Sequence, residues 1–327
     1  MRDLLERLFA GQVLNRPEAR ALLDRVLDGE YAPEQLAALL ACYRMRLPTA
    51  AELAGMRDSL LERATPVDLD APDAIDMVGT GGDGKDTFNV TTISALTVAA
   101  CGYRVVKHGN GSASSKHGSS DTLRAAGFSF RQNEDDLRRQ LDAAGVTFLH
   151  APLFHPQLAS VAPVRRALRV GTIFNLLGPL ANPALPQYNF VGVADARTQG
   201  LYAEVFAEVS ESYNIVHSND GYDEATLTGP VRCFASDGRY TLQPRDFGLP
   251  PTPAEAIAVV DDSVAQFRRI LGGDGSRAET DTVAANAGLA IQTARGHTTP
   301  LIACVAEARE ALLDGRVAQT FAKLCAV

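Results

Sequence analysis

The chain has 327 residues, 46% of them apolar, which is enough to bury a large core in one domain or two. Acidic residues outnumber basic ones by 39 to 31, and the formal charge of −8 argues against nucleic acid or membrane partners. No apolar run is long enough to span a bilayer, and the acidic start does not resemble a signal peptide, so we expect a cytoplasmic protein. Five scattered cysteines without CxxC spacing argue against disulfides or a zinc cluster, and we expect most of them to be buried.

The first part of the chain predicts helices only. Apolar residues recur at three- and four-residue spacing in residues 2–10, 16–28, 32–45 and 50–64, with proline and glycine between these runs. A short acidic segment with two prolines follows, and the pattern changes beyond it. We therefore predict a helical domain in residues 1–66 and a second domain in residues 73–327.

Beyond this boundary, strands alternate with helices, which predicts a mainly parallel sheet flanked by helices. The candidate strands are residues 74–78, 104–106, 146–149, 189–193 and 214–217. Residues 155–185 are again helical and interrupted by proline, so we predict an excursion that packs back on the first helices. The expected fold class is α/β, with a small all-helical domain and a larger domain around the sheet.

A glycine-rich loop follows the first predicted strand and leads into a helical run. It reads Gly79-Thr80-Gly81-Gly82-Asp83-Gly84-Lys85-Asp86-Thr87-Phe88-Asn89. Glycines let main-chain N–H groups approach phosphate oxygens, and a helix N-terminus favours negative charge. Four glycines in six residues exceed what a tight turn needs, so we interpret the loop as a phosphate site.

Two familiar motifs fit this loop only in part. The P-loop pattern requires Ser or Thr after its lysine, but Asp86 follows Lys85. The dinucleotide fingerprint expects an acid about 20 residues further on, whereas the second strand leads to Lys107. The loop therefore matches neither class.

A second polar loop begins at the end of the next strand. It runs from Lys107 to Asp121 and combines lysines, hydroxyls and glycines, which suit a phosphate or pyrophosphate. Loops at the carboxyl ends of neighbouring parallel strands face the same crevice, so we expect it beside the glycine loop. The alternative is a surface loop in which Ser119 or Ser120 caps the next helix, and both roles are compatible.

Several spaced motifs occur in a specific order along the chain. They are residues 79–83 with 89–92, residues 107–110 with Ser114, Ser115, Gly118 and Ser119, residues 163–166, residues 172–183, and Asp223-Glu224. In this order they resemble the anthranilate phosphoribosyltransferases over nearly the whole chain. That family is a branch of the phosphoribosyltransferase and nucleoside phosphorylase fold.

The resemblance implies that phosphoribosyl pyrophosphate is the donor and anthranilate the acceptor. It assigns donor binding to Gly79, Gly81, Gly82, Asp83, Thr87, Asn89, Thr91, Thr92, Lys107, Ser115 and Ser119. It assigns anthranilate binding to His108, Gly109, Asn110 and Arg165, whose guanidinium can form a forked pair with a carboxylate. Lys107 and Arg165 are the implied catalytic residues.

The resemblance also implies Mg²⁺ as cofactor and a homodimer formed through the N-terminal helices. The implied metal ligands are Thr91, Asp223 and Glu224, whose hard oxygens suit magnesium. An adjacent acidic pair in a loop is, on its own, usually solvated charge. Only the other motifs make this pair a metal site.

Four positions depart from the family pattern. Gly111 stands where the family commonly has Arg, and Thr91 where it commonly has Ser. The family reads Gly-x-Arg before the next Thr, whereas Arg169 and Gly171 are exchanged here. We expect the helix end near Arg165 to differ for this reason.

Two other functions fit less well. A pyrimidine nucleoside phosphorylase of the same fold reads Lys-His-Ser-Gly where this chain continues from Lys107 with His-Gly-Asn. A nucleic-acid-binding relative without catalysis would be basic and lack motif residues, whereas this chain is acidic and retains Asp223 and Glu224.

Overall fold

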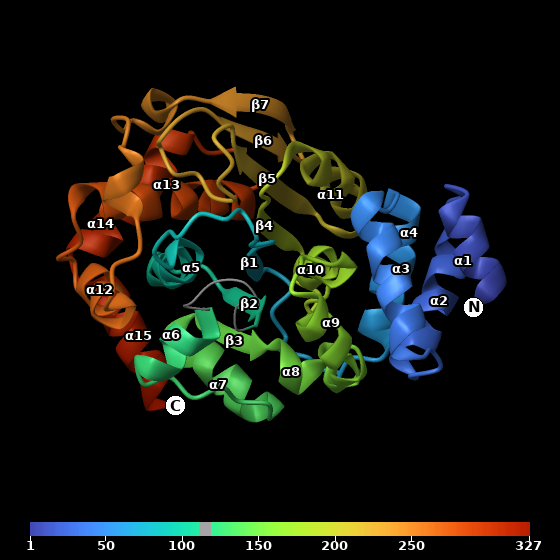
Figure 1. The fold of residues 1–327 in the computed structure, drawn as a ribbon. Coiled ribbons are helices and arrows are strands. Elements are labelled where there is room, and N and C mark those ends of the chain that lie inside the picture. The colour runs from blue at the N-terminus through green and yellow to red at the C-terminus, as the bar shows by residue number, and fades with distance from the viewer. Residues whose placement is uncertain (111–118) are drawn as a thin grey trace. The chain divides into compact units, whose positions relative to one another are not determined.

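The computed structural model describes residues 1–110 and 119–327 and divides the chain into two compact units (Figure 1). Unit 1 comprises Met1–Pro66 and Ala151–Pro183, and unit 2 comprises Val67–His150 and Ala184–Val327. Unit 1 is all helical, and unit 2 contains a mostly parallel sheet flanked by helices. The predicted fold class is therefore confirmed.

Unit 1 begins with the helices expected from the apolar spacing, within two residues at each end. They are α1 (Arg2–Phe9), α2 (Arg16–Leu27), α3 (Pro33–Met45) and α4 (Ala50–Glu62). The later segment adds α8 (Ala151–Phe154), α9 (Ala162–Leu168), α10 (Ile173–Leu177) and the 3₁₀ turns Pro156–Ser160 and Gly178–Leu180. Helices α9 and α10 contact α3, and α10 also contacts α4, so the later segment packs on the first helices.

Helices α2 and α4 pack closely at a glycine. A Cβ atom on Gly55 would lie 2.1 Å from the main-chain oxygen of Arg16, which no side chain can accommodate. Both helices begin with a capping box, in which Asn15 bonds Glu18 and Thr49 bonds Glu52. Local side-chain hydrogen bonds thus fix where α2 and α4 begin. The absence of a Cβ at Gly55 allows the two helices to pack closely.

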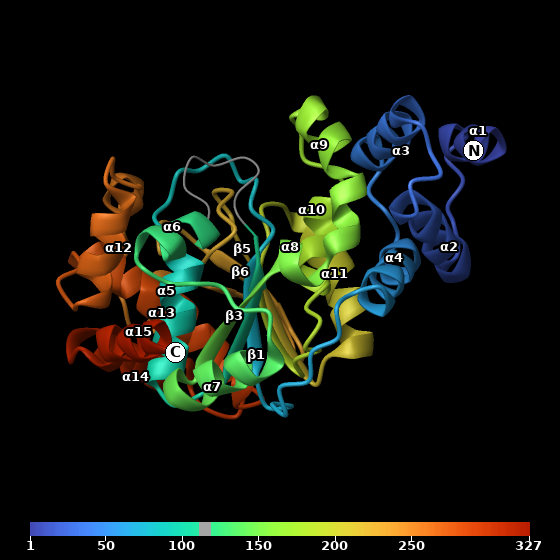
Figure 2. The same cartoon turned by 90° about the horizontal axis from the view of Figure 1, so that it is seen from below.

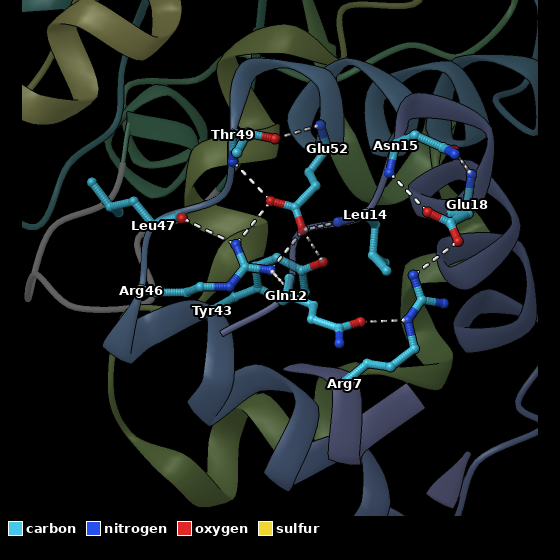
Figure 3. Close-up of polar contacts among 10 residues, drawn as sticks. All are labelled: Arg7, Gln12, Leu14, Asn15, Glu18, Tyr43, Arg46, Leu47, Thr49 and Glu52. Carbon is cyan, nitrogen blue, oxygen red and sulfur yellow. Dashed lines mark hydrogen bonds and ion pairs between the residues drawn. The ribbon is translucent and has the colours of Figure 1, made fainter. Parts of the chain in front are cut away.

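A buried carboxylate ties the loops of unit 1 together (Figure 3). Glu52 is fully buried and accepts hydrogen bonds from Leu14 N (3.0 Å), Tyr43 Oη (3.1 Å), Thr49 N (2.8 Å) and Arg46 Nη2 (2.6 Å). Burial by itself raises the pKa of Glu52, but these bonds to the ionised form outweigh it and leave the pKa lowered. The group stays charged inside the unit because its partners replace water.

Unit 2 is built on a seven-stranded sheet in the order β3-β2-β1-β4-β5-β6-β7. The strands are β1 (Ile75–Gly79), β2 (Val105–Gly109), β3 (Val146–His150), β4 (Tyr188–Gly192), β5 (Ser212–Ser218), β6 (Val231–Ala235) and β7 (Gly238–Leu242). The first five pair in parallel, as predicted, whereas β6 and β7 are antiparallel and were not predicted. The glycine loop and the second loop follow the carboxyl ends of the neighbouring strands β1 and β2.

Helices cover both faces of this sheet (Figure 2). They are α5 (Val90–Ala100), α6 (Ser119–Ala125), α7 (Glu134–Ala144), α11 (Ala196–Val209), α12 (Ser263–Leu271), α13 (Arg277–Ala294), α14 (Leu301–Leu313) and α15 (Arg316–Ala326). Helices α5 and α13 pack together on one face, and α11 packs on β5 and β6 on the other. The main apolar core lies between the sheet and α5, α13, α14 and α15.

The cysteines only partly follow the expectation of burial. Cys233 and Cys304 are buried, Cys42 and Cys101 are half-buried, and Cys325 is exposed. All five are free thiols. Among the residues that the structure describes, no helix combines the length and apolarity that a membrane span requires.

Candidate active site

The glycine loop needs its glycines for backbone conformation. Gly81, Gly82 and Gly84 have positive φ values of 61°, 78° and 70°, a region that side-chain-bearing residues rarely adopt. The loop ends at Asn89, the N-cap residue of α5, whose side chain makes no capping bond. The main chain can therefore present N–H groups to an anion, as predicted for a phosphate site.

The acidic pair lies in a loop after β5 that the surrounding chain holds in place. Ser218 Oγ donates to the main-chain oxygen of Glu224 (2.6 Å). The side chain of Asn286 on α13 bonds both the N–H and the carbonyl of Ala225 (3.0 Å each). Asp223 is buried and Glu224 half-buried, so the pair is not the solvated surface charge that two adjacent acids usually form.

Hydrogen bonds join the glycine loop to this acidic loop. Gly81 N donates to Asp223 Oδ2 (2.9 Å). The hydroxyls of Thr87 and Thr91 donate to the two carboxylate oxygens of Glu224, at 3.3 and 3.2 Å. The structure thus brings Thr91 and the predicted donor loop together with the predicted metal ligands Asp223 and Glu224, which lie more than 130 residues further along the chain.

The acidic loop also lies against the ends of two paired strands. Gly79 of β1 and Gly192 of β4 are register partners, and Thr80 N donates to Gly192 O (2.9 Å). A Cβ on Gly192 would lie 1.7 Å from the main-chain oxygen of Asp223, and one on Gly79 would lie 2.8 Å from Asp223 Oδ2. The sequence analysis missed Gly192, whose only signal there is a glycine near the end of a predicted strand.

The carboxylates of this site are electrostatically crowded. Burial, and then repulsion by Asp83, raises the pKa of Asp223, and burial with repulsion by both neighbours raises the pKa of Glu224. Burial also raises the pKa of Asp83. Burial lowers the pKa of Lys107, although Glu224 and Asp223 favour its charged form. A bound cation would relieve this crowding.

The predicted catalytic lysine is buried within the sheet. The side chain of Lys107 on β2 is 5% exposed, and its ammonium donates a hydrogen bond to the carbonyl oxygen of Met77 on β1. The next residue, His108, is also buried, and its N–H donates to Asp76 Oδ1 (3.2 Å). Gly109 ends the strand.

Three buried polar atoms near the glycine loop have no hydrogen-bond partner among the described residues. They are Asp83 Oδ2, Asn89 Nδ2 and Thr92 Oγ1. Buried polar atoms are nearly always paired in folded proteins, so unpaired ones call for an explanation. All three belong to the predicted donor set, and a bound phosphoribosyl group would supply partners for them.

The second loop lies mostly outside the described residues, including the positions of Gly111, Ser114 and Ser115. Its flanks are described: Ser119 Oγ donates to the carbonyl oxygen of Asn110 (3.2 Å). Helix α6 begins at Ser119, so Ser119 and Ser120 lie in its first turn and not before it. The hydroxyl of Ser120 bonds Nδ1 of His150 (3.2 Å).

Arg165 belongs to unit 1, on α9. Its guanidinium lies 5.2 Å from the centroid of the Phe174 ring, and burial lowers its pKa. Within the described part of the chain, no carboxylate lies within ion-pair distance of Arg165, so its charge is available for a ligand. Helix α9 ends at Arg169, whose φ of 53° is in the left-handed region.

Metal binding by protein side chains alone is not supported within residues 1–110 and 119–327. No group of three or more His, Cys, Asp or Glu side chains there could hold a metal ion. Asp223 and Glu224 could offer only part of a coordination shell. This suits magnesium, which usually keeps several waters and takes phosphate oxygens as further ligands.

Comparison with known proteins finds relatives that match nearly the whole chain. Residues 2–64 match the helical bundle domain of a glycosyl transferase family, and residues 71–318 match its a/b domain. The anthranilate phosphoribosyltransferases of Flavobacterium psychrophilum and Christiangramia forsetii are each 41% identical over 327 residues, covering 99% of this chain and 98% of theirs. The chain belongs to the anthranilate phosphoribosyltransferase family.

Solved structures of the family share the fold. The crystal structure of the Thermus thermophilus enzyme superposes with a TM-score of 0.91 at 36% identity, covering 98% of both chains. The Saccharomyces cerevisiae enzyme, solved in complex with PRPP and Mg, gives a TM-score of 0.88 at 23% identity and covers 98% of this chain and 96% of its own. The resemblance seen in the sequence motifs is therefore confirmed at the level of the family.

Proposed function

We propose that this protein transfers the phosphoribosyl group of phosphoribosyl pyrophosphate to anthranilate, giving phosphoribosyl-anthranilate and pyrophosphate, a step of tryptophan biosynthesis. Membership of the family supports this activity. The observation that carries it in this chain is the bonding of the glycine loop to the acidic pair, through Gly81 to Asp223 and through Thr87 and Thr91 to Glu224. The proposed anion site and the proposed cation site would therefore adjoin, as a pyrophosphate donor with a metal requires.

The donor would bind at the glycine loop. The main chain at Gly79, Gly81 and Gly82 would bind phosphate oxygens, and Gly81 N would then give up its hydrogen bond to Asp223. The unpaired atoms of Asp83, Asn89 and Thr92 would bond the ribose or phosphate oxygens. Thr87, Thr91 and Ser119 would complete the donor set among the described residues, and Ser115 remains a prediction outside them.

Asp223, Glu224 and the hydroxyl of Thr91 would hold Mg²⁺. These residues suit Mg²⁺ because two carboxylates that repel each other lie beside the proposed phosphate site. The hydroxyl of Thr91 lies 3.2 Å from the Glu224 carboxylate. When bound, the ion would neutralise negative charge on the pyrophosphate as its bond to the ribose breaks. The two protein carboxylates would fix the position of the ion.

The reaction breaks the bond between the anomeric carbon and pyrophosphate and forms a bond from that carbon to the anthranilate nitrogen. Positive charge builds on the ribose and negative charge on the leaving group, so positioning and electrostatic stabilisation dominate catalysis. The acceptor amine is a weak base that is already neutral, and it can release its proton to water after attack. Lys107 would supply positive charge to the pyrophosphate once its ammonium leaves the Met77 carbonyl.

The acceptor would bind at His108, Gly109 and Asn110 and at Arg165. Arg165 supports this assignment because it is half-buried, stacked on Phe174 and free of a carboxylate partner among the described residues. A guanidinium of this kind can bond a carboxylate through two parallel hydrogen bonds. It would orient the amine of anthranilate by fixing the acid group next to it on the ring.

We also propose a cytoplasmic homodimer that associates through the N-terminal helices, with residues 1–66 and the 155–185 excursion as one domain and 73–327 as the other. Exposed apolar side chains at the ends of α1 and α3 and in the loop between α1 and α2 support self-association. Phe9 is 63% exposed, Val13 53% and Met45 90%, which is apolar surface that a second copy could bury.

A direct assay tests the activity. The protein is incubated with phosphoribosyl pyrophosphate, Mg²⁺ and anthranilate, and the loss of anthranilate fluorescence is followed, with product mass confirmed by mass spectrometry. We expect loss only when donor and magnesium are both present. Constant fluorescence in the complete mixture, with folded protein, would rule out the proposed reaction.

A further inference from the structure

The glycine loop carries one cation that the donor set does not use. Lys85 stands where a P-loop places its phosphate lysine, but its ammonium lies 4.8 Å from the centroid of the Tyr222 ring. Its side chain forms no ion pair with a carboxylate of the described residues. The lysine therefore faces an aromatic ring, although five acidic side chains lie in the glycine loop and the loop after β5.

Tyr222 is a fixed partner for this lysine. It is 7% exposed and belongs to the main apolar core of unit 2. Its carbonyl oxygen accepts a hydrogen bond from Ser218 N (3.1 Å), and Gly221 N donates to Ser218 O (2.9 Å). The ring is thus held by a tight turn at the end of β5, whereas Lys85 is exposed and reaches it from the glycine loop.

The lysine stem passes next to Gly221. Its φ is 95°, which side-chain-bearing residues rarely adopt, and an added Cβ would lie 3.9 Å from Lys85 Cε. The stem therefore passes over a residue without a side chain before the ammonium reaches the ring. The positive φ of Gly221 and the position of the Lys85 stem next to it are thus compatible.

The contact lies next to the site. Tyr222 directly precedes Asp223 and Glu224, and Lys85 lies between Asp83 and Thr87 in the glycine loop. The main-chain and hydroxyl bonds from the glycine loop to Asp223 and Glu224 use the atoms that a metal ion would take. The Lys85–Tyr222 contact joins the same two loops without using any carboxylate oxygen.

We propose that Lys85 and Tyr222 are positioning residues that hold the glycine loop on the acidic loop through a cation–π contact, so that the phosphate site and the metal site keep their spacing when the carboxylates turn to magnesium. This inference rests on the proposed function. A contact of this kind at an exposed site contributes enough to change an affinity about two- to five-fold.

The test compares variants in the complete assay, with kcat and KM measured for each substrate and magnesium titrated. Lys85→Met keeps the stem and removes the charge, Lys85→Arg keeps a cation that stacks on aromatic rings, and Tyr222→Phe keeps the ring face. Tyr222→Leu removes the face. Lys323→Met, at an exposed lysine on α15, is the matched control for loss of one charge.

We expect Lys85→Met to raise both the donor KM and the magnesium concentration for half-maximal activity about two- to five-fold, with kcat at saturation and the anthranilate KM unchanged. Lys85→Arg, Tyr222→Phe and Lys323→Met should match wild type. Tyr222→Leu should reproduce the effect of Lys85→Met, and combining the two should add nothing further. Should Tyr222→Leu fail to fold, the contrast of Lys85→Met with Lys85→Arg decides.

Two results would overturn the positioning role. Wild-type constants in Lys85→Met would show that the contact does nothing for the site. Additive losses in the double variant would show that Lys85 touches the donor directly, as a P-loop lysine does. A wild-type protein that forms no product would refute the proposed function and this role with it, whereas the first two results leave the proposed function standing.

Discussion

The ammonium of Lys107 on β2 donates a hydrogen bond to the main-chain carbonyl oxygen of Met77 on the neighbouring strand β1. The Lys107 ammonium, which we propose binds pyrophosphate, is therefore buried within the sheet. Burial lowers the pKa of Lys107. A lowered pKa means that the folded protein disfavours the charged form, so the lysine costs folding free energy. Its retention fits a role in binding an anion, for which a buried charge is most effective.

Lys107→Met tests this trade between stability and activity. Removing the ammonium should lower kcat/KM for the donor by the equivalent of about 1.5–3 kcal/mol, the usual contribution of a hydrogen bond to a charged group. The thermal midpoint without ligands should stay the same or rise, because the buried charge is gone. Unchanged donor binding and turnover would place Lys107 outside the site.

Arg165→Ala should act on the acceptor alone. The guanidinium would bond only the anthranilate carboxylate, so its loss should raise the anthranilate KM while the donor KM stays close to wild type. Arg166→Ala is the matched control, because Arg166 is the exposed neighbour on the same helix and should leave both constants unchanged. Loss of donor binding with normal acceptor binding would reverse the assignment.

The parallel part of the sheet was predictable and the antiparallel part was not. Strands β1 to β5 are short apolar runs between helices, a pattern typical of a buried parallel sheet. Strands β6 and β7 contain charged residues such as Arg232 and Arg239 and form a hairpin at the sheet edge. The Asp237-Gly238 dipeptide, where the turn leads into β7, is a hairpin signal that the sequence did contain.

The two phosphate loops were predictable because glycines and hydroxyls follow strands directly in the chain. Contacts made only in three dimensions were not. Gly192 must lack a side chain because the main-chain carbonyl of Asp223, which is remote in sequence, lies against it. Lys85 and Tyr222 are likewise remote in sequence and come into contact only in the folded structure. Burial of Asp223 was also hidden, since an acidic pair in a loop is by default solvated.

This burial changes the expected stability of a metal-site variant. Solvated loop carboxylates would contribute little to folding, but crowding raises the pKa values of Asp223 and Glu224 above those of the unfolded chain. The folded state then binds more protons than the unfolded state from about pH 4 upward, so wild-type stability falls as pH rises through this window. Neutral isosteres remove that fall.

Asp223→Asn combined with Glu224→Gln should therefore stabilise the ligand-free protein by roughly 1–3 kcal/mol near neutral pH and by almost nothing near pH 4. Thermal unfolding in a chelator across this range measures the effect. Activity should fall strongly at ordinary magnesium and recover in part at high magnesium. Wild-type activity across the magnesium titration would contradict the metal assignment. A thermal midpoint below that of wild type at neutral pH would contradict the repulsion among these carboxylates.

Arg169→Gly should stabilise unit 1. Arg169 caps α9 with φ 53° and ψ 26°, a left-handed conformation that strains residues with a Cβ and suits glycine. After subtracting the greater flexibility of glycine in the unfolded chain, the gain should be about 0.5–1 kcal/mol. Arg166→Gly makes the same change inside the helix and should instead cost about 1 kcal/mol. Equal effects of the two changes would show that the strain at Arg169 is absent.

Glu52→Gln should destabilise unit 1 because Glu52 is the shared acceptor that joins Leu14, Tyr43, Arg46 and Thr49 (Figure 3). A neutral amide leaves the Arg46 guanidinium with a weaker partner and brings an N–H group among donors. Breaking a buried charge pair costs about 3–5 kcal/mol. Unfolding in urea at pH 7 should show a loss of that order.

The pH dependence of this loss identifies its cause. The folded pKa of Glu52 lies below the unfolded value, so its contribution is complete above about pH 4.5 and disappears as pH falls through the folded pKa. The difference between wild type and Glu52→Gln should therefore be constant from pH 7 to 5 and shrink below that. Glu62→Gln, which removes an exposed partner of Arg20, is the matched control and should change little at any pH. A difference at Glu52 that stays the same down to pH 3 would mean that packing, and not the ionised carboxylate, holds these loops.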